Sequence, residues 1–171
     1  MGFSKFSLII YGDGGKSEML KILRRLIIEI LGTNNYIIMI RDEDDAPSEE
    51  LNRTFLEEME SITRDRSKFT THMPNLEHNN DNLYVLNHPR SKGILKVGLS
   101  IVPRSLEKQV VKKTVELKCP SENEILEMDP HEALKCLAKK YYDGDNVKLI
   151  RESSTWLKGE TWVNEINCLV N

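Results

Sequence analysis

The feature that most constrains the fold is an apolar run that ends in a cluster of carboxylates. Residues 36–40 read Tyr-Ile-Ile-Met-Ile, and residues 41–45 read Arg-Asp-Glu-Asp-Asp. A short, mostly β-branched apolar run predicts a strand buried on both faces, as in a parallel sheet. Asp42 and Asp44 are two positions apart, so their side chains leave the same face of an extended chain.

Two carboxylates on one side of a chain repel each other unless a cation lies between them or one is protonated. Ligands of open α/β sheets bind at the carboxyl ends of the strands. This position therefore favours a divalent-metal site. The alternative is a solvated acidic loop that follows a core strand and needs no ligand.

Composition sets the class of protein. The chain has 171 residues, 39% apolar and 30% charged, which suits a soluble globular protein of one domain or one domain with a small appendage. The net charge of −3 gives no global basic field for nucleic acid, although a local basic patch stays open. The three cysteines form no CxxC pair, which excludes a zinc ribbon. Without a signal peptide or an apolar run of transmembrane length, we expect a cytoplasmic protein.

The N-terminal part predicts a strand–helix–strand unit. Residues 6–11 favour a strand, and the glycines of residues 12–15 favour a turn. The helix that follows has apolar residues at i, i+3 and i+4 and ends at Gly32. Such a unit is expected to form a right-handed parallel crossover.

The middle of the chain continues the α/β pattern. Pro47 favours the start of a second helix that runs to about Arg64. Residues 65–82 are polar and predict a long loop, with residues 69–73 as a short strand candidate. Two further strands are expected at residues 83–87 and 94–102.

The last third of the chain predicts helices only. A helix is expected over residues 105–117, and Asp129-Pro130 opens another that ends near Gly144. Two more helical pieces are expected at residues 146–157 and 160–169.

The predicted fold class is therefore α/β, with a mostly parallel central sheet, helices on both faces and a C-terminal helical extension. We expect the α/β domain to cover residues 1–117 and the helical extension to cover residues 118–171.

Residues 12–17, Gly-Asp-Gly-Gly-Lys-Ser, offer a phosphate-binding alternative. Free N–H groups and the helix dipole favour an anion at this helix start, where Lys16 and Ser17 are the candidate ligands. A full P-loop needs a glycine five residues before Gly15, and Ile10 occupies that position. The loop is too short to surround a triphosphate, and a plain glycine turn is the competing interpretation.

The order of these elements resembles the toprim fold of topoisomerases, primases and overcoming-lysogenization-defect nucleases. It is most similar to the small stand-alone toprim-like proteins of bacteria and archaea. The likeness covers roughly residues 5–115. It rests on the segment 38–45, the helix at residues 49–64, and the strand that leads to Pro103 and Glu107.

The resemblance implies a Mg²⁺ or Mn²⁺ site. By this likeness Asp42 and Asp44 are the metal ligands and Glu107 is a third carboxylate. Arg41 and Arg104 lie next to these positions in the sequence and are candidates to hold a phosphodiester.

One departure from the family affects its chemistry. The first strand of toprim proteins usually leads into Glu-Gly, and the glutamate transfers a proton, but Tyr11-Gly12 stands in that place here. Tyrosine, with a pKa of about 10, is a poor general base at neutral pH. Asp13 and Glu18 are the candidates to replace it.

Three functions stay open at the level of sequence. The first is a metal-dependent nuclease or phosphoesterase that acts on DNA or RNA. The second is a binding or regulatory module that keeps the scaffold without the chemistry, and the third is nucleotide or phosphate binding through residues 12–17. No membrane partner is expected, and the oligomeric state is open, with a homodimer as one alternative.

Overall fold

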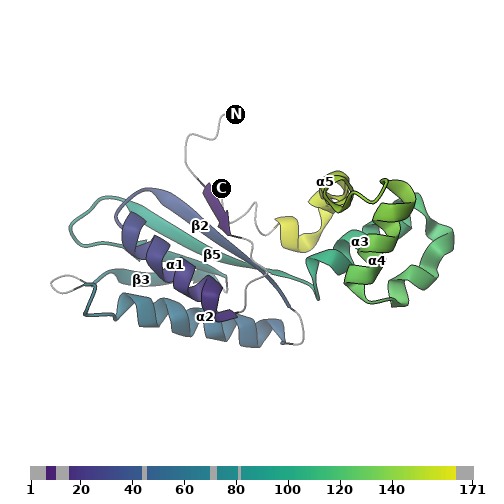
Figure 1. The fold of residues 1–171 in the computed structure, drawn as a ribbon. Coiled ribbons are helices and arrows are strands. Elements are labelled where there is room, and N and C mark those ends of the chain that lie inside the picture. Colours follow the sequence, from purple (N-terminus) through teal and green to yellow (C-terminus); the bar gives the residue numbers. More distant parts are fainter. Residues whose placement is uncertain (1–6, 11–15, 44–45, 70–72, 81, 165–171) are drawn as a thin grey trace. The chain divides into compact units, whose positions relative to one another are not determined.

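The computed structural model describes residues 7–10, 16–43, 46–69, 73–80 and 82–164. The chain divides into two compact units, a sheet unit and a helical unit (Figure 1). Of the described residues, the sheet unit comprises those up to residue 41 and those from 46 to 101, and the helical unit comprises residues 42–43 and 102–164. The expected boundary after residue 117 thus lies one helix later than the division in the structure. None of the described helices is long and apolar enough to cross a bilayer.

A five-stranded sheet forms the centre of the sheet unit. Its strands are β1 (Ser7–Ile10), β2 (Asn35–Asp42), β3 (Asn75–Asn80), β4 (Leu83–Asn87) and β5 (Ile94–Val102), in the order β1-β2-β5-β4-β3. Ile37, Ile38 and Met39 in β2 are all buried, which confirms the prediction of a strand covered on both faces.

The sheet is mixed, so the prediction of a mostly parallel sheet is wrong. β1 pairs with β2 in parallel, whereas β4 is antiparallel to both β3 and β5. β2 and β5 run in the same direction, because the Ile94 N–H donates to Asn34 at their starts and the Glu43 N–H donates to Val102 at their ends. The connections β3–β4 and β4–β5 are too short for a parallel crossover, which explains the antiparallel half.

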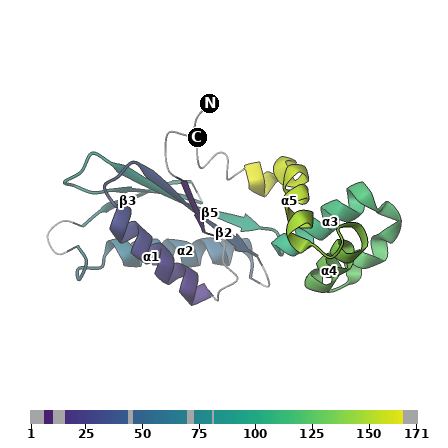
Figure 2. The ribbon, with the colours of Figure 1, turned by 45° about the horizontal axis from the view of Figure 1, so that its top comes forward.

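Both helices of the sheet unit pack on the same face of the sheet, not on opposite faces as expected (Figure 2). The helices α1 (Lys16–Ile30) and α2 (Ser48–Thr63) share one core with alternate residues of three strands. The buried members of this core are Met19, Leu23, Ile27, Ile37, Met39, Leu51, Phe55, Met59, Ile62, Tyr84, Leu86, Leu95, Val97, Leu99 and Ile101. The connections β1–α1–β2 and β2–α2–β3 both cross the sheet in the direction from β1 towards β3. Because such crossovers are right-handed, both helices lie on the same side of the sheet.

Strand β3 was not predicted. It covers six residues of the expected loop, reads Asn-Leu-Glu-His-Asn-Asn, and forms one edge of the sheet. An edge strand needs no apolar alternation, so its sequence carries no strand period. Its His78 ring stacks on the ring of Tyr84 in β4, with the centroids 4.6 Å apart.

The helical unit contains α3 (Leu106–Lys118), the 3₁₀ helix η1 (Pro120–Glu127), α4 (Pro130–Tyr141), α5 (Asn146–Trp156) and the 3₁₀ turn η2 (Leu157–Gly159). The predicted start of α4 is confirmed, because the Asp129 carboxylate accepts the N–H groups of His131 and Glu132. Gly144, with a φ of 81°, follows α4 as expected for a left-handed stop. The apolar core side chains are Val110, Val111, Val115, Cys119, Ile125, Ala133, Leu134, Leu137, Ala138, Tyr142, Leu149, Leu157 and Trp162.

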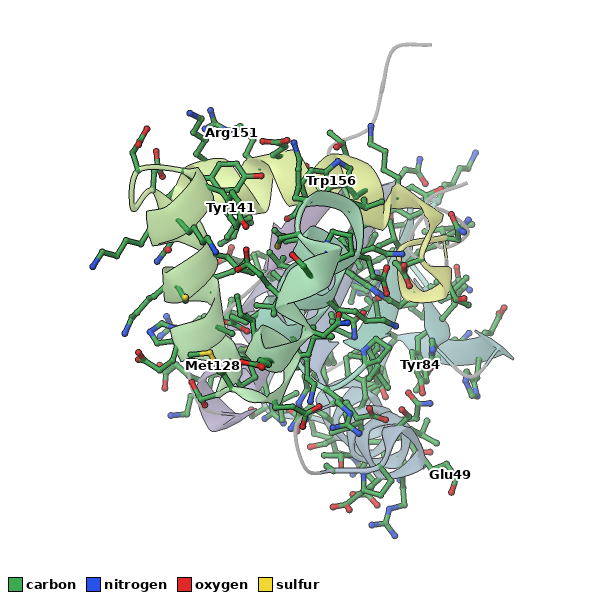
Figure 3. All side chains as sticks on the ribbon, turned by 90° about the vertical axis from the view of Figure 1, so that its right-hand side faces the viewer. Glu49, Tyr84, Met128, Tyr141, Arg151 and Trp156 are labelled. Carbon is green, nitrogen blue, oxygen red and sulfur yellow. The ribbon has the colours of Figure 1, made fainter. Side chains whose placement is uncertain are left out.

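Charged hydrogen bonds connect η1 to the end of α4. The Glu122 carboxylate accepts hydrogen bonds from Lys140 Nζ, at 2.6 Å, and from the hydroxyl of Tyr141, which is labelled in Figure 3. The bond from Lys140, followed by the bond from Tyr141, lowers the pKa of Glu122. The same carboxylate raises the pKa of Tyr141 and, through its hydrogen bond, the pKa of Lys140.

Gly93→Ala is expected to destabilise the sheet unit by about 1–3 kcal/mol, because a rigid backbone lies against this glycine. A Cβ at Gly93 would lie 1.9 Å from the carbonyl oxygen of Gly32, and that oxygen already accepts the Ser91 hydroxyl. Urea unfolding followed by circular dichroism measures the loss. Gly159→Ala is the control, since nothing lies within 4 Å of its Cβ position and its stability should change by less than about 0.5 kcal/mol.

Glu122→Gln is expected to reduce the acid sensitivity of the helical unit. A carboxylate with a lowered pKa stabilises the fold above its ordinary value of 4.5 and loses that contribution as the pH falls through the folded-state pKa. Urea midpoints of the wild type should therefore fall more steeply on acidification than those of the variant. Glu124→Gln, at an exposed position two residues away, is the control and should follow the wild type. If the urea midpoints of all three proteins fell equally with pH, the contribution of the Glu122 carboxylate to acid sensitivity would be contradicted.

Candidate functional site

The acidic segment of residues 42–45 begins inside the sheet. β2 is longer than the apolar run that predicted it and includes Arg41 and Asp42. The Glu43 N–H donates to the carbonyl oxygen of Val102, the last residue of β5, over 2.9 Å. The carboxyl ends of two strands that run in the same direction are therefore neighbours, and the acidic segment leaves the sheet there.

Two carboxylates of this segment bind the backbone at the start of α3. The Leu106 N–H donates to Asp42 Oδ1 over 3.0 Å, and the Arg104 N–H donates to Glu43 Oε2 over 3.2 Å. All four residues belong to the helical unit. We call this arrangement the acidic rim: Asp42 and Glu43 together with the backbone of Arg104 and Leu106.

The start of α3 is well provided with hydrogen-bond acceptors. The first four N–H groups of a helix lack partners within the helix. Asp42 accepts the N–H of Leu106, and Ser105 is the N-cap, whose Oγ accepts the N–H of Lys108 over 3.2 Å. Negative charge is favourable at this end of a helix dipole, so the carboxylates of Asp42 and Glu107 both stabilise α3.

A metal cage made of protein ligands alone is not found in the part of the chain that the structure describes. Among those residues, no three His, Cys, Asp or Glu side chains form a group that could hold a metal ion. Glu107 is half-buried in the first turn of α3. Its role as a third carboxylate stays a prediction, because the predicted site also includes Asp44. Asp44, the second predicted ligand, lies outside the described residues.

The chemistry of the acidic rim is compatible with a magnesium ion that is bound by only one or two protein ligands. Mg²⁺ usually keeps several waters and binds one or two carboxylates together with substrate phosphates. A carboxylate has about four lone-pair sites, so accepting an N–H and binding a cation are compatible. Carboxylates that ligate metals are themselves commonly hydrogen-bonded, which fixes their direction.

The described candidates near the N-terminus lie on α1, in the sheet unit. Tyr11 and Asp13 lie outside the described residues, and Lys16 and Ser17 are the first two residues of α1. Glu18, in the first turn of α1, is exposed and forms a 3.5 Å ion pair with Lys21 on the same helix. This exposed ion pair is weak and gives Glu18 no feature of a general base.

The two predicted arginines differ in exposure. Arg41 is half-buried in β2, directly before Asp42. Arg104 is exposed and has a φ of 63°, a left-handed conformation that is uncommon for a residue with a side chain. The hydrogen bond from its N–H to Glu43 holds this conformation.

Sequence reasoning missed one member of the acidic rim, Glu43, and the N-cap residue beside it, Ser105. Glu43 was passed over because it points away from the Asp42–Asp44 face in an extended chain, and its partner lies 61 positions away. Ser105 carried a usable signal, because a serine directly before an amphipathic run is a helix N-cap pattern.

Asp42→Ala is expected to destabilise the protein by about 1 kcal/mol, because the Leu106 N–H loses its acceptor at a helix start. Asp42→Asn is the matched control, since the amide oxygen still accepts this bond and most of the stability should return. Urea unfolding of the three proteins gives the comparison. Equal stability of Asp42→Ala and the wild type would show that the bond contributes nothing.

Comparisons of the chain with protein-family models, with curated proteins and with solved structures found no match. The toprim-like relationship therefore stays a prediction from the residues quoted above.

Proposed function

We propose that this chain is a toprim-like protein that binds one Mg²⁺ or Mn²⁺ ion at residues 42–45 and acts on nucleic-acid phosphodiesters. The observation that carries the proposal is the fixing of Asp42 by the Leu106 N–H at the carboxyl ends of β2 and β5. Ligands of open α/β sheets bind at this edge. A carboxylate held there by a backbone bond is pre-oriented for a cation.

The residues of the site divide into two roles. Asp42 and Asp44 would hold the ion, and Arg104, exposed at the start of α3, would bind a phosphodiester oxygen. The bound ion would polarise the phosphate and lower the pKa of a water molecule. The N-terminal end of α3 adds positive potential where the anion would lie.

A second candidate is a binding module without hydrolytic chemistry. Asp42 and Glu43 accept backbone N–H groups, which is a sufficient structural reason for both carboxylates. Tyr11 also replaces the glutamate that transfers a proton in toprim proteins. The two candidates differ in whether a metal binds and whether a substrate is cleaved.

Calorimetric titration with Mn²⁺ tests the proposal. We expect one ion per chain, with affinity reduced at least tenfold in Asp42→Asn and in Asp44→Asn. Asp129→Asn is the matched control, because Asp129 also accepts helix N–H groups but at the start of α4, and its affinity should equal that of the wild type. Asparagine keeps the hydrogen-bond acceptor at each position, so loss of affinity reports the charge and not the fold.

Incubation of end-labelled single- and double-stranded DNA and RNA with Mn²⁺ tests activity. Cleavage by the wild type that disappears in Asp42→Asn and persists in Asp129→Asn would support the enzymatic proposal. Metal binding without cleavage would favour the binding module. Absence of Mn²⁺ binding would contradict the metal proposal itself.

A further inference from the structure

A groove crosses the helical unit between α3 and the segment that joins η1 to α4. Its volume is about 550 Å³, within the range of ligand sites. Its apolar lining consists of Pro103, Val111, Leu126, Met128, Pro130 and Ala133. Val111 and Ala133 are buried, whereas Met128 is 43% exposed and lies at the end of α4 opposite Tyr141 (Figure 3).

Cations line the α3 side of this groove. Arg104 precedes the helix, and Lys108 and Lys112 follow at steps of four residues, about 6 Å apart along one helix face. Glu116 continues the same row and Glu127 contributes a second carboxylate, so the lining has three cations and two anions. The positive end of the groove coincides with the N-terminal end of the α3 dipole.

The lysines of α3 divide into two groups by their partners. Outside the groove, Lys113 forms a 2.7 Å ion pair with Glu160, and Lys118 forms a 2.8 Å ion pair with Glu152. Inside the groove, Lys112 has only a 3.9 Å contact with Glu116, and the described carboxylates provide no ion pair for Lys108. The ammonium groups of Lys108 and Lys112 therefore lack the close ion pairs of Lys113 and Lys118, which leaves them able to bind an anionic ligand.

The backbone of Arg104 points to the same conclusion. A left-handed φ of 63° is unfavourable for a residue with a Cβ. Glycine or asparagine would fill this position without that cost, yet the chain places an exposed arginine at the mouth of the groove. Strained residues of this kind cluster at functional sites.

We propose that this groove binds an amphipathic, acidic helix of a partner protein. Apolar side chains of the partner would enter between α3 and α4, and its carboxylates would pair with Arg104, Lys108 and Lys112. Met128 is suited to such a contact because its flexible thioether adapts to different side chains. The described residues that line the groove include no aromatic ring, and single-stranded nucleic acid uses aromatic rings as a stacking surface.

The groove shares Arg104 with the proposed phosphodiester site but contains neither predicted metal ligand. The proposal is tested on the full chain by fluorescence anisotropy. The probe is a labelled 18-residue peptide with leucines at i, i+3, i+4 and i+7 and glutamates on the polar face. A second peptide carries lysines in place of the glutamates, and a third probe is labelled oligo(dT). The protein variants are Lys108→Glu, Met128→Glu and, as an exposed control on α4 outside the groove, Lys139→Glu.

The wild type should bind the acidic peptide at least tenfold more tightly than the lysine peptide. Lys108→Glu and Met128→Glu should each weaken this binding at least tenfold, whereas Lys139→Glu should bind as the wild type does. Equal binding by all variants, or no binding of the acidic peptide, would overturn the proposal. Binding of oligo(dT) that is lost in Lys108→Glu would assign the groove to nucleic acid instead. Mn²⁺ affinity should stay unchanged in all three variants, which separates this test from that of the metal site.

Discussion

The hydrogen bond from the Leu106 N–H to the Asp42 carboxylate is the interaction on which the candidate site depends. It joins the end of β2 to the first turn of α3, two segments 64 positions apart in the chain. It satisfies an otherwise unpaired helix N–H and brings negative charge to the favourable end of the α3 dipole. The Asp42 carboxylate thus has a defined hydrogen-bond partner, and the protein itself compensates part of its charge.

This compensation changes the meaning of the acidic pattern. Clustered carboxylates in a solvated loop would require a cation only if they were held close together. Here Asp42 and Glu43 are oriented by backbone donors, which serves a structural role and would also orient a carboxylate for the proposed metal ion. The same two bonds therefore support both candidate functions, and metal affinity distinguishes them.

Much of the fold was predictable because its elements carry strong local patterns. The apolar period predicted α1 and α2, and Asp129-Pro130 predicted the start of α4. The direction of the strands was predicted incorrectly, although the short connection between β4 and β5 already excluded a parallel crossover. β3 had no apolar period, because it forms an edge of the sheet, so no local pattern could reveal it.

The candidate site was less predictable, because its contacts join residues distant in the chain. Asp42 was found from the end of an apolar run, but its backbone partner could not be read from sequence. Glu107 was selected by resemblance, and in the structure it contributes to the start of α3 without joining a described metal-binding group. The cations of α3 are interspersed with carboxylates, so only the structure separates the lysines with close ion pairs, Lys113 and Lys118, from the lysines of the groove.

The most direct test of the central claim is a crystal structure of the protein soaked in Mn²⁺, with anomalous scattering used to locate the ion. The claim predicts one anomalous peak in contact with the Asp42 carboxylate, which still accepts the Leu106 N–H. The claim would be contradicted if, at saturating Mn²⁺, Asp42 kept this hydrogen bond and no anomalous peak lay beside it. The carboxylates of Asp42 and Glu43 would then have only a structural role.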